Sequence, residues 1–187
     1  MKRHLHPTPS RRHFLRTGLS AVAAAPALAL PQRAWAAPVR ELAFDHLHTH
    51  EQIDIVYARG SDYLPDALGQ LNHFLRDHYS GDVGRIDPGL HDLLHAVRRE
   101  LGTERAFQVI SGYRSPATNA QLKATRGGGV ATHSLHMEGR AIDVRLPGVA
   151  LSDLRDAALS LKAGGVGYYP HEQFVHIDTG RVRRWGG

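Results

Sequence analysis

The sequence contains no cysteine, and this absence removes a whole class of chemistry. Its 187 residues can form no disulfide, no thiolate nucleophile and no cysteine-ligated zinc site. Such a composition suits an oxidising compartment without requiring disulfides. Any metal site must therefore draw on histidine and carboxylate side chains, and the chain has 14 histidines.

The first 36 residues contain no aspartate or glutamate, although they carry six lysine or arginine residues. The remainder holds 17 basic and 18 acidic residues, so the formal charge of +5 for the whole chain becomes −1 for residues 37–187. No basic stripe with interleaved aromatic residues occurs in that remainder. We therefore expect no nucleic-acid partner.

The N-terminal segment is organised like an export signal. A charged stretch precedes an apolar stretch rich in alanine and leucine, and Ala34-Trp35-Ala36 forms a small-x-small cleavage site. Arg11-Arg12 resembles the twin-arginine signal, which carries folded proteins across the inner membrane of bacteria. An ordinary secretory signal and an uncleaved anchor are the alternatives. The apolar stretch contains Pro26 and is short for a membrane span.

We therefore expect residues 1–36 to be a twin-arginine signal peptide and the mature protein to act in the periplasm, with no stable membrane span after cleavage. Residues 37–187 show no internal repeat and no long linker, which predicts a single domain. We expect this domain to be a monomer.

Periodicity predicts an α+β fold for this domain. Residues 41–57 alternate as a β-hairpin that turns near Thr49–Glu51. Helices are expected over residues 65–79, 87–101 with Asp87 as N-cap, 115–124 ended by residues 126–129, and 152–162 with Ser152 as cap. Strands are expected over residues 106–111, 140–146, 165–169 and 174–180. Because strands cluster late and the βαβ alternation is absent, an antiparallel sheet with helices packed on it is predicted.

Eleven histidines fall in residues 37–187, more than one site requires. Four lie on predicted helices, where solvated or capping roles are expected: His73, His78, His91 and His95. Another three, His46, His48 and His50, alternate and would share one strand face. These three fit either a second metal site or a cluster at the surface of the hairpin tip, and we prefer the second interpretation.

His136, Asp143 and His176 differ from the other candidates. Asp143 lies in the apolar stretch "AIDVRL", where an unpaired carboxylate is costly to bury. His176 lies in "FVHIDTG", so two adjacent strands can direct both side chains to one point while the turn at 134–139 delivers His136. Two histidines and one carboxylate leave the fourth position of zinc open for water, as in catalytic sites. The same residues also fit His–Asp hydrogen bonds that brace the sheet, and the ligand set also suits iron or manganese.

Three stretches together resemble the zinc D-Ala-D-Ala peptidase superfamily, whose fold is shared with the Hedgehog signalling domain. They are "SGYRSPATNAQL", "SLHMEGRAID" and "VGYYPHEQFVHIDTG". Ser134, His136, Gly139, Asp143 and His176 match the superfamily pattern Ser-x-His-x-x-Gly-x-x-x-Asp with a later histidine. The "LHT" hairpin and the ending "FVHIDTG" resemble the murein endopeptidase K-like branch, over about residues 41–185.

The resemblance implies a periplasmic endopeptidase that uses Zn²⁺ to cleave cross-links between peptidoglycan stem peptides, at a bond between D-centres. It makes His136, Asp143 and His176 the metal ligands. Arg114 is implied to contact the substrate carbonyl or carboxylate, which suits its permanent, fork-shaped charge. We assign Tyr113 and Ser134 to the same substrate-binding region. A carboxypeptidase or dipeptidase that trims D-alanine is one alternative, and a non-catalytic peptidoglycan-binding zinc module is another.

The general base departs from the pattern of the superfamily. Many members place a carboxylate three residues before the last ligand, where this chain has Gln173. Glu172 shares a strand face with His176 if the strand extends back that far, which makes it our narrowly preferred base. His133 is the other catalytic candidate. Asp178, two residues after His176, is expected to support that ligand from behind.

Overall fold

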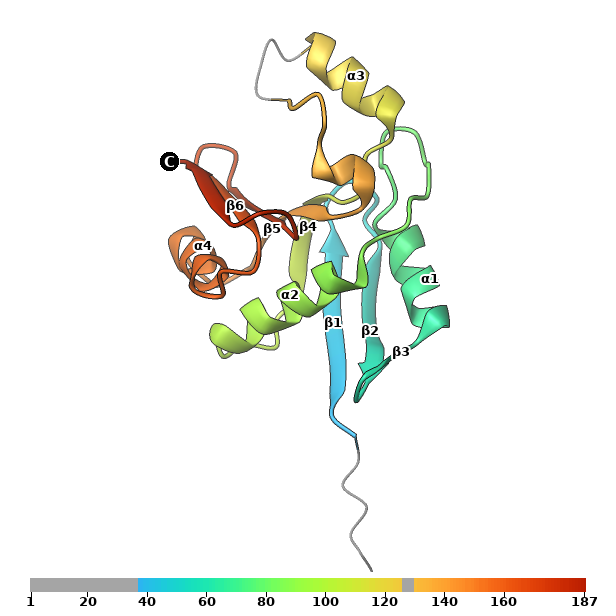
Figure 1. Ribbon diagram of the computed structural model, residues 1–187, viewed down its shortest axis with the longest axis vertical. Helices are drawn as coiled ribbons and strands as arrows, with labels where there is room; N and C mark the ends of the chain where they lie inside the picture. The colour runs from blue at the N-terminus through green and yellow to red at the C-terminus, as the bar shows by residue number, and fades with distance from the viewer. Residues whose placement is uncertain (1–36, 126–129) are drawn as a thin grey trace, which may run out of the picture. The chain divides into compact units, whose positions relative to one another are not determined.

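The computed structural model describes residues 37–125 and 130–187. The expected signal peptide at 1–36 and the expected helix end at 126–129 lie outside the described residues. An eight-stranded sheet with the order β3-β2-β1-β4-β5-β7-β6-β8 organises the domain (Figure 1). Within the described ranges, no helix has both the length and the apolar character that crossing a membrane requires.

The elements follow one another along the chain with short connections. They are β1 (Val39–His46), β2 (Gln52–Arg59), β3 (Asp62–Tyr63), α1 (Pro65–Phe74), α2 (Pro88–Glu100), β4 (Phe107–Ser111), α3 (Pro116–Thr125), η1 (Leu135–Glu138), β5 (Ala141–Arg145), α4 (Leu151–Ser160), β6 (Gly165–Tyr169), β7 (Phe174–Asp178) and β8 (Arg183–Gly186). The predicted α+β class is confirmed.

The sheet is mixed, so the prediction of an antiparallel sheet is only partly confirmed. The hairpins β1–β2 and β6–β7 are antiparallel, as are the pairs β4–β5 and β5–β7. β1 and β4 run parallel, as do β6 and β8. The chain crosses from β2 to β4 through α1 and α2, and a long crossover allows a parallel strand that a tight hairpin does not.

Local patterns located most element ends correctly. The hairpin turn lies between His46 and Gln52, as predicted. Asp87 caps α2, because its side chain accepts a hydrogen bond from the amide of Gly89 at 2.9 Å. The cap predicted at Ser152 is wrong: α4 begins at Leu151, one residue earlier, and no side chain caps it. The short strands β3 and β8 were not predicted.

Alternate residues of the sheet form one core with the apolar faces of the helices. Ile142 and Val144 of β5 belong to this core, as do Val175 and Ile177 of β7. Successive side chains of a strand point to opposite faces. The intervening residues of β5 and β7 therefore point to the other face of the sheet.

One histidine of α2 and the three histidines near the hairpin turn depart from expectation. His91 is fully buried in α2 against the ring of Tyr57, with 5.6 Å between ring centroids, so its expected solvated role is wrong. Among the described residues, neither ring nitrogen of His91 has a hydrogen-bond partner. His46, His48 and His50 do not share a strand face, because β1 ends at His46 and His50 adopts a left-handed φ of 59°.

Candidate metal centre

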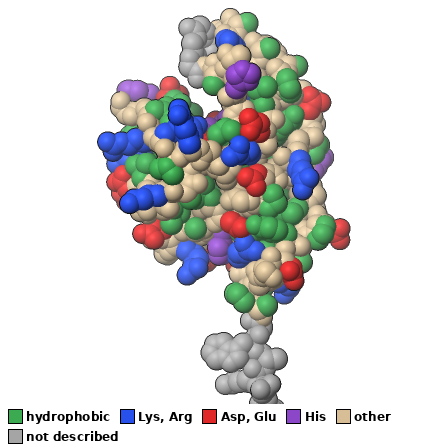
Figure 2. Space-filling view, viewed as in Figure 1, with side chains coloured by type: hydrophobic (Ala, Val, Ile, Leu, Met, Phe, Trp, Pro, Cys, Tyr) green, Lys and Arg blue, Asp and Glu red, His purple; other side chains and the backbone are tan. Residues whose placement is uncertain are grey.

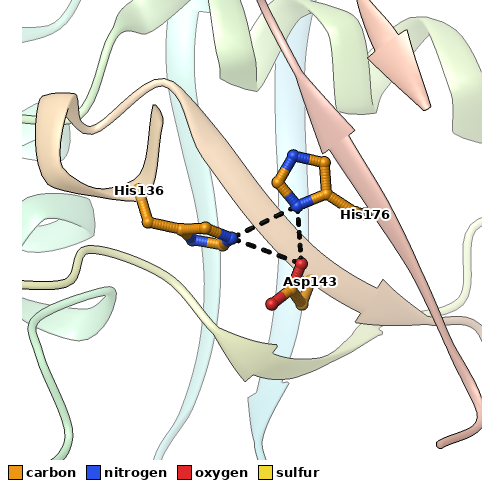
Figure 3. Close-up of side chains that lie close together, drawn as sticks. All are labelled: His136, Asp143 and His176. Carbon is orange, nitrogen blue, oxygen red and sulfur yellow. Dashed lines mark hydrogen bonds and ion pairs between the residues drawn. The ribbon is translucent and has the colours of Figure 1, made fainter. Parts of the chain in front are cut away.

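Two neighbouring strands and one short turn bring the predicted ligands together (Figure 3). Asp143 of β5 and His176 of β7 are direct partners in the antiparallel register, so their side chains leave the same face side by side. His136 comes from η1, which Ser134 begins by accepting a hydrogen bond from the His136 amide at 3.4 Å.

Gly139 ends η1 in a conformation that only glycine adopts easily. Its φ is 66°, and an added Cβ would lie 2.0 Å from the carbonyl oxygen of Arg85. The glycine of the motif therefore allows the loop before α2 to pack against the turn that carries His136.

Three ligand atoms converge on one point. Nδ1 of His176 lies 2.8 Å from Oδ1 of Asp143, and Nε2 of His136 lies 3.3 Å from the same oxygen. The two ring nitrogens are 3.2 Å apart. Ligands of a tetrahedral zinc ion, at bond lengths of 2.0–2.2 Å, are roughly 3.3 to 3.6 Å apart. The chemistry and spacing of these three donors therefore fit a zinc ion after a shift of roughly half an ångström.

In each histidine, the ring nitrogen that faces away from Asp143 makes a hydrogen bond to a second partner. Nδ1–H of His136 donates to the backbone carbonyl of Gly112 at 2.7 Å. Nε2–H of His176 donates to Oδ2 of the fully buried Asp178 at 3.1 Å. These contacts fix the ring orientations and leave Nε2 of His136 and Nδ1 of His176 facing Asp143.

Asp178 is itself saturated with donors. It accepts hydrogen bonds from the amides of Gly165 and Gly180 and from both terminal nitrogens of Arg183. Burial alone would raise its pKa, but the hydrogen bonds from His176, Arg183 and the two amides hold the pKa well below its usual range. Asp178 is therefore a carboxylate at neutral pH.

Burial and hydrogen bonding also oppose each other in their effects on the pKa values of the candidate ligands. Burial alone would raise the pKa of Asp143, and the two adjacent imidazoles lower it far below the ordinary value. Burial alone would lower the pKa of His176, and the hydrogen bonds with Asp143 and Asp178 raise it instead. The two carboxylates thus stabilise a positive charge at His176.

A cleft of about 650 Å³ opens onto this centre. Arg114, His133, Ser134 and Glu172 line it together with the three candidate ligands. Figure 2 shows the face hollowed between α3 and the β6–β7 end, with acidic and basic side chains interspersed around it.

Two predicted residues lie in surroundings that differ from those expected. The ring of Tyr113 packs against Gly84, where an added Cβ would lie 2.2 Å from it, and Tyr113 is not among the residues that line the cleft. Glu172 lies outside the strand, because β7 begins at Phe174 and Gln173 has a left-handed φ of 60°. The argument from strand parity is therefore wrong, although the exposed Glu172 still faces the cleft.

Among the cleft residues with aromatic or charged side chains, four were not predicted from the sequence: Tyr169, Phe174, Arg183 and Trp185. Arg183 and Trp185 belong to β8, whose four residues are too short for a period to be recognised. Their spacing of two, which places both on one face of a strand, is the signal that was available.

An α+β fold with a largely buried His–Asp–His group beneath an open cleft defines a candidate metallohydrolase. The profile of the family described as peptidoglycan L,D-endopeptidase MepK matches residues 34–185, and the chain belongs to this family. The predicted membership of the murein endopeptidase K-like branch is thereby confirmed.

Two relatives show how far the similarity extends. The chain is 49% identical over 146 residues to peptidoglycan L,D-endopeptidase MepK of Escherichia coli strain K12, which covers 78% of this chain and 80% of that protein. It is 39% identical over 149 residues to the probable peptidoglycan L,D-endopeptidase MepK of Haemophilus influenzae, covering 79% and 80%. No solved structure matches the chain, so the Hedgehog-type fold stays a prediction.

Proposed function

We propose that this protein is a zinc-dependent endopeptidase that hydrolyses peptide cross-links of peptidoglycan. The observation that carries the proposal is the convergence of His136, Asp143 and His176 within 2.8–3.3 Å at the cleft of a member of this family. The relatives are named as L,D-endopeptidases, so we propose an L,D bond in place of the bond between D-centres that the resemblance suggested.

The three ligands would hold the metal through Nε2 of His136, Nδ1 of His176 and a carboxylate oxygen of Asp143. When bound, zinc supplies a Lewis acid for the scissile carbonyl and a water of lowered pKa. Zinc is preferred over iron and manganese because two histidines and one carboxylate with an open position are typical of zinc peptidases.

Arg114 is proposed to bind the carbonyl or carboxylate of the substrate. It lines the cleft, and its backbone amide donates to the carbonyl of His136 at 3.2 Å, which ties the arginine to the turn that carries a ligand. A guanidinium keeps its charge at every working pH and offers two parallel donors to an oxygen pair. Ser134, which begins η1, lies in the same part of the cleft.

Glu172 and His133 are the proposed proton-transfer residues, because both line the cleft and neither is a ligand. One of them takes a proton from the attacking water and returns it to the leaving amine. Gln173 cannot do this, and its side chain donates instead to the carbonyl of Pro170.

The proposed place of action is the periplasm, reached by twin-arginine export of a folded monomer. Peptidoglycan lies in that compartment, and a folded exported chain brings its metal site already formed.

The test is digestion of purified peptidoglycan with the wild-type protein and with His136→Ala, Asp143→Ala and His176→Ala. Each variant should lose its metal and its activity, because removing one of three ligands also leaves a buried partner unpaired. His73→Ala, a change at an exposed histidine, is the control and should retain both. Metal content is measured by elemental analysis, and full occupancy in any two ligand variants would refute the site.

Product analysis of the same digest separates the alternatives. Conversion of cross-linked dimers to monomers supports the endopeptidase. Release of D-alanine alone supports a carboxypeptidase or dipeptidase. A full metal content with no product from any fraction supports a binding module, the alternative that Gln173 keeps open.

A further inference from the structure

Trp185 lies against a metal ligand because of a glycine between them. Gly167 of β6 pairs with His176 of β7 on one side and with Trp185 of β8 on the other. An added Cβ at Gly167 would lie 2.7 Å from the indole ring. The missing side chain lets the indole lean across β6, and its ring centroid comes to 5.2 Å from that of His176.

The indole is fixed on its other sides as well. Its Nε1–H donates to the hydroxyl of Tyr169 at 2.8 Å, and the ring of Tyr169 stacks on Phe174 at 4.6 Å between centroids. The guanidinium of Arg183 lies 4.7 Å from the indole centroid. We call Tyr169, Phe174 and Trp185 the aromatic wall. A surface held in this way loses little conformational entropy when a ligand binds.

The wall offers apolar surface at the reacting centre. All three of its residues line the cleft that contains the ligands and Arg114, so the cleft combines a cation with a row of aromatic rings. The indole N–H is already bonded to Tyr169 and Arg183 lies over the ring, so a substrate would contact the part of the ring that Arg183 leaves uncovered. Such a surface binds methylene groups in preference to charged groups.

We propose that the aromatic wall determines specificity by binding the methylene chain of the diamino acid that flanks the scissile bond. The proposal rests on the proposed function, because a peptidoglycan cross-link runs through the side chain of a diamino acid. Charged ends of that residue would reach solvent or Arg114, while its methylene groups lie against Trp185. A sugar is the less fitting occupant, because the wall is in direct contact with a ligand histidine and the glycan lies at the far end of the stem peptide.

The test compares two synthetic peptides that share the scissile bond and differ in one flanking side chain, diaminopimelyl in one and alanyl in the other. Wild-type protein should favour the diaminopimelyl peptide. Trp185→Ala should lower kcat/KM for this peptide, mainly through KM, by about tenfold to a hundredfold more than it lowers kcat/KM for the alanyl peptide. Trp185→Phe should restore most of the preference. Zinc affinity, measured by titration of the metal-free protein, should be unchanged in both variants.

Gly167→Ala provides a matched second variant that keeps the indole and displaces it. It should reproduce the loss of preference seen in Trp185→Ala. In the Trp185→Ala background the same change should have no further effect, because the added Cβ no longer meets a ring.

Equal losses of kcat/KM on both peptides, together with weakened zinc affinity, would overturn the proposal. Trp185 would then have the role of positioning His176. Unchanged preference in Trp185→Ala would also overturn the proposal. Equilibrium binding of both peptides to the metal-free protein is measured alongside. If wild-type protein cleaves neither peptide, the proposed function fails, and a selective loss of diaminopimelyl binding in Trp185→Ala still supports the wall.

Discussion

His91 is a buried histidine whose cost to folding should depend on pH. Burial lowers its pKa to about 4 from an ordinary value of 6.5. Between these values the unfolded chain binds a proton that the folded chain does not, so stability falls as the pH falls from 6.5 toward 4. Between pH 6.5 and pH 5, the free energy of unfolding should therefore fall by about 2 kcal/mol less in His91→Leu than in the wild type.

Urea unfolding at the two pH values measures this difference. At pH 7 the leucine variant should also be more stable by about 1 kcal/mol, because His91 buries two ring nitrogens without partners among the described residues. His73→Leu, at an exposed position, should leave the pH dependence as in the wild type. A His91→Leu protein with an unchanged pH dependence would contradict this account.

The identity of the general base is a second question at the level of single residues. Glu172→Gln leaves the ligands intact, so it should retain its metal and lower turnover by about a hundredfold to ten-thousandfold if Glu172 moves the proton. His133→Ala should then have a small effect. Turnover and metal content are measured on the same preparations. An unchanged rate in Glu172→Gln together with a large loss in His133→Ala would assign the base to His133.

Sequence reasoning located residues well where a motif fixed them and poorly where it relied on an assumed backbone. His136, Asp143 and His176 were proposed as one group from their spacing, and they lie together. Glu172 was placed on a strand that does not reach it, because the left-handed backbone of Gln173 ends the alternation. Trp185 had no pattern around it long enough to indicate a strand.

At the scale of elements, the loop between α1 and α2 holds the segment that carries Arg114. Asp77 of this loop is buried and accepts hydrogen bonds from the amide of Ser115 at 2.8 Å and from that of Tyr79 at 2.9 Å. The amide of Tyr113 donates to the carbonyl of Leu75 at 2.8 Å. Arg114 thus lies between two points of attachment.

Asp77→Ala should loosen this segment while leaving the ligands in place. We expect a raised KM, a smaller change in kcat and an unchanged metal content. Asp77→Asn keeps one acceptor oxygen, so its KM should lie between those of Asp77→Ala and the wild type. Asp66→Asn, at an exposed position in α1, is the control. Loss of metal in Asp77→Asn would contradict the expectation that Asp77 holds the Arg114 segment without supporting the metal site.

The same carboxylate should influence acid stability. Burial alone would raise the pKa of Asp77, but hydrogen bonds from Thr118 and from the amides of Ser115 and Tyr79 lower it to about 2. A depressed pKa stabilises the fold above the unfolded value of 3.8, and this stabilisation disappears as the pH falls toward 2. It amounts to about 2 kcal/mol, so unfolding of Asp77→Asn should depend less on pH across that window.

The start of α2 was predicted correctly because the side chain of Asp87 marks it. The start of α4 has no side-chain cap, so the nearest capping residue, Ser152, was chosen wrongly. The parallel pairing of β1 with β4 could not be predicted from the sequence for a different reason. Alternation shows which face of a strand is buried, but it does not show the direction in which the strand enters the sheet.

At the scale of the whole molecule, the leader should determine where the domain is found. Changing both Arg11 and Arg12 to lysine should leave an unprocessed precursor in the cytoplasm, because a receptor reads the arginine pair as an address. Arg33→Lys is a matched control outside the pair. Cell fractionation and precursor size give the result. Normal processing of the paired variant, with export that requires an unfolded chain, would exclude the twin-arginine route.

The two histidines of the proposed metal site differ in whether a substitution can remove the group that supports them. The partner of His136 is the backbone carbonyl of Gly112, which every amino acid possesses. Because an added Cβ there would lie 2.6 Å from the carbonyl oxygen of Leu75, a change of codon 112 can displace this acceptor but never delete it. The partner of His176 is the side chain of Asp178, which a single base change can remove. One substitution can therefore delete the support of His176, whereas a substitution at position 112 can only move the support of His136.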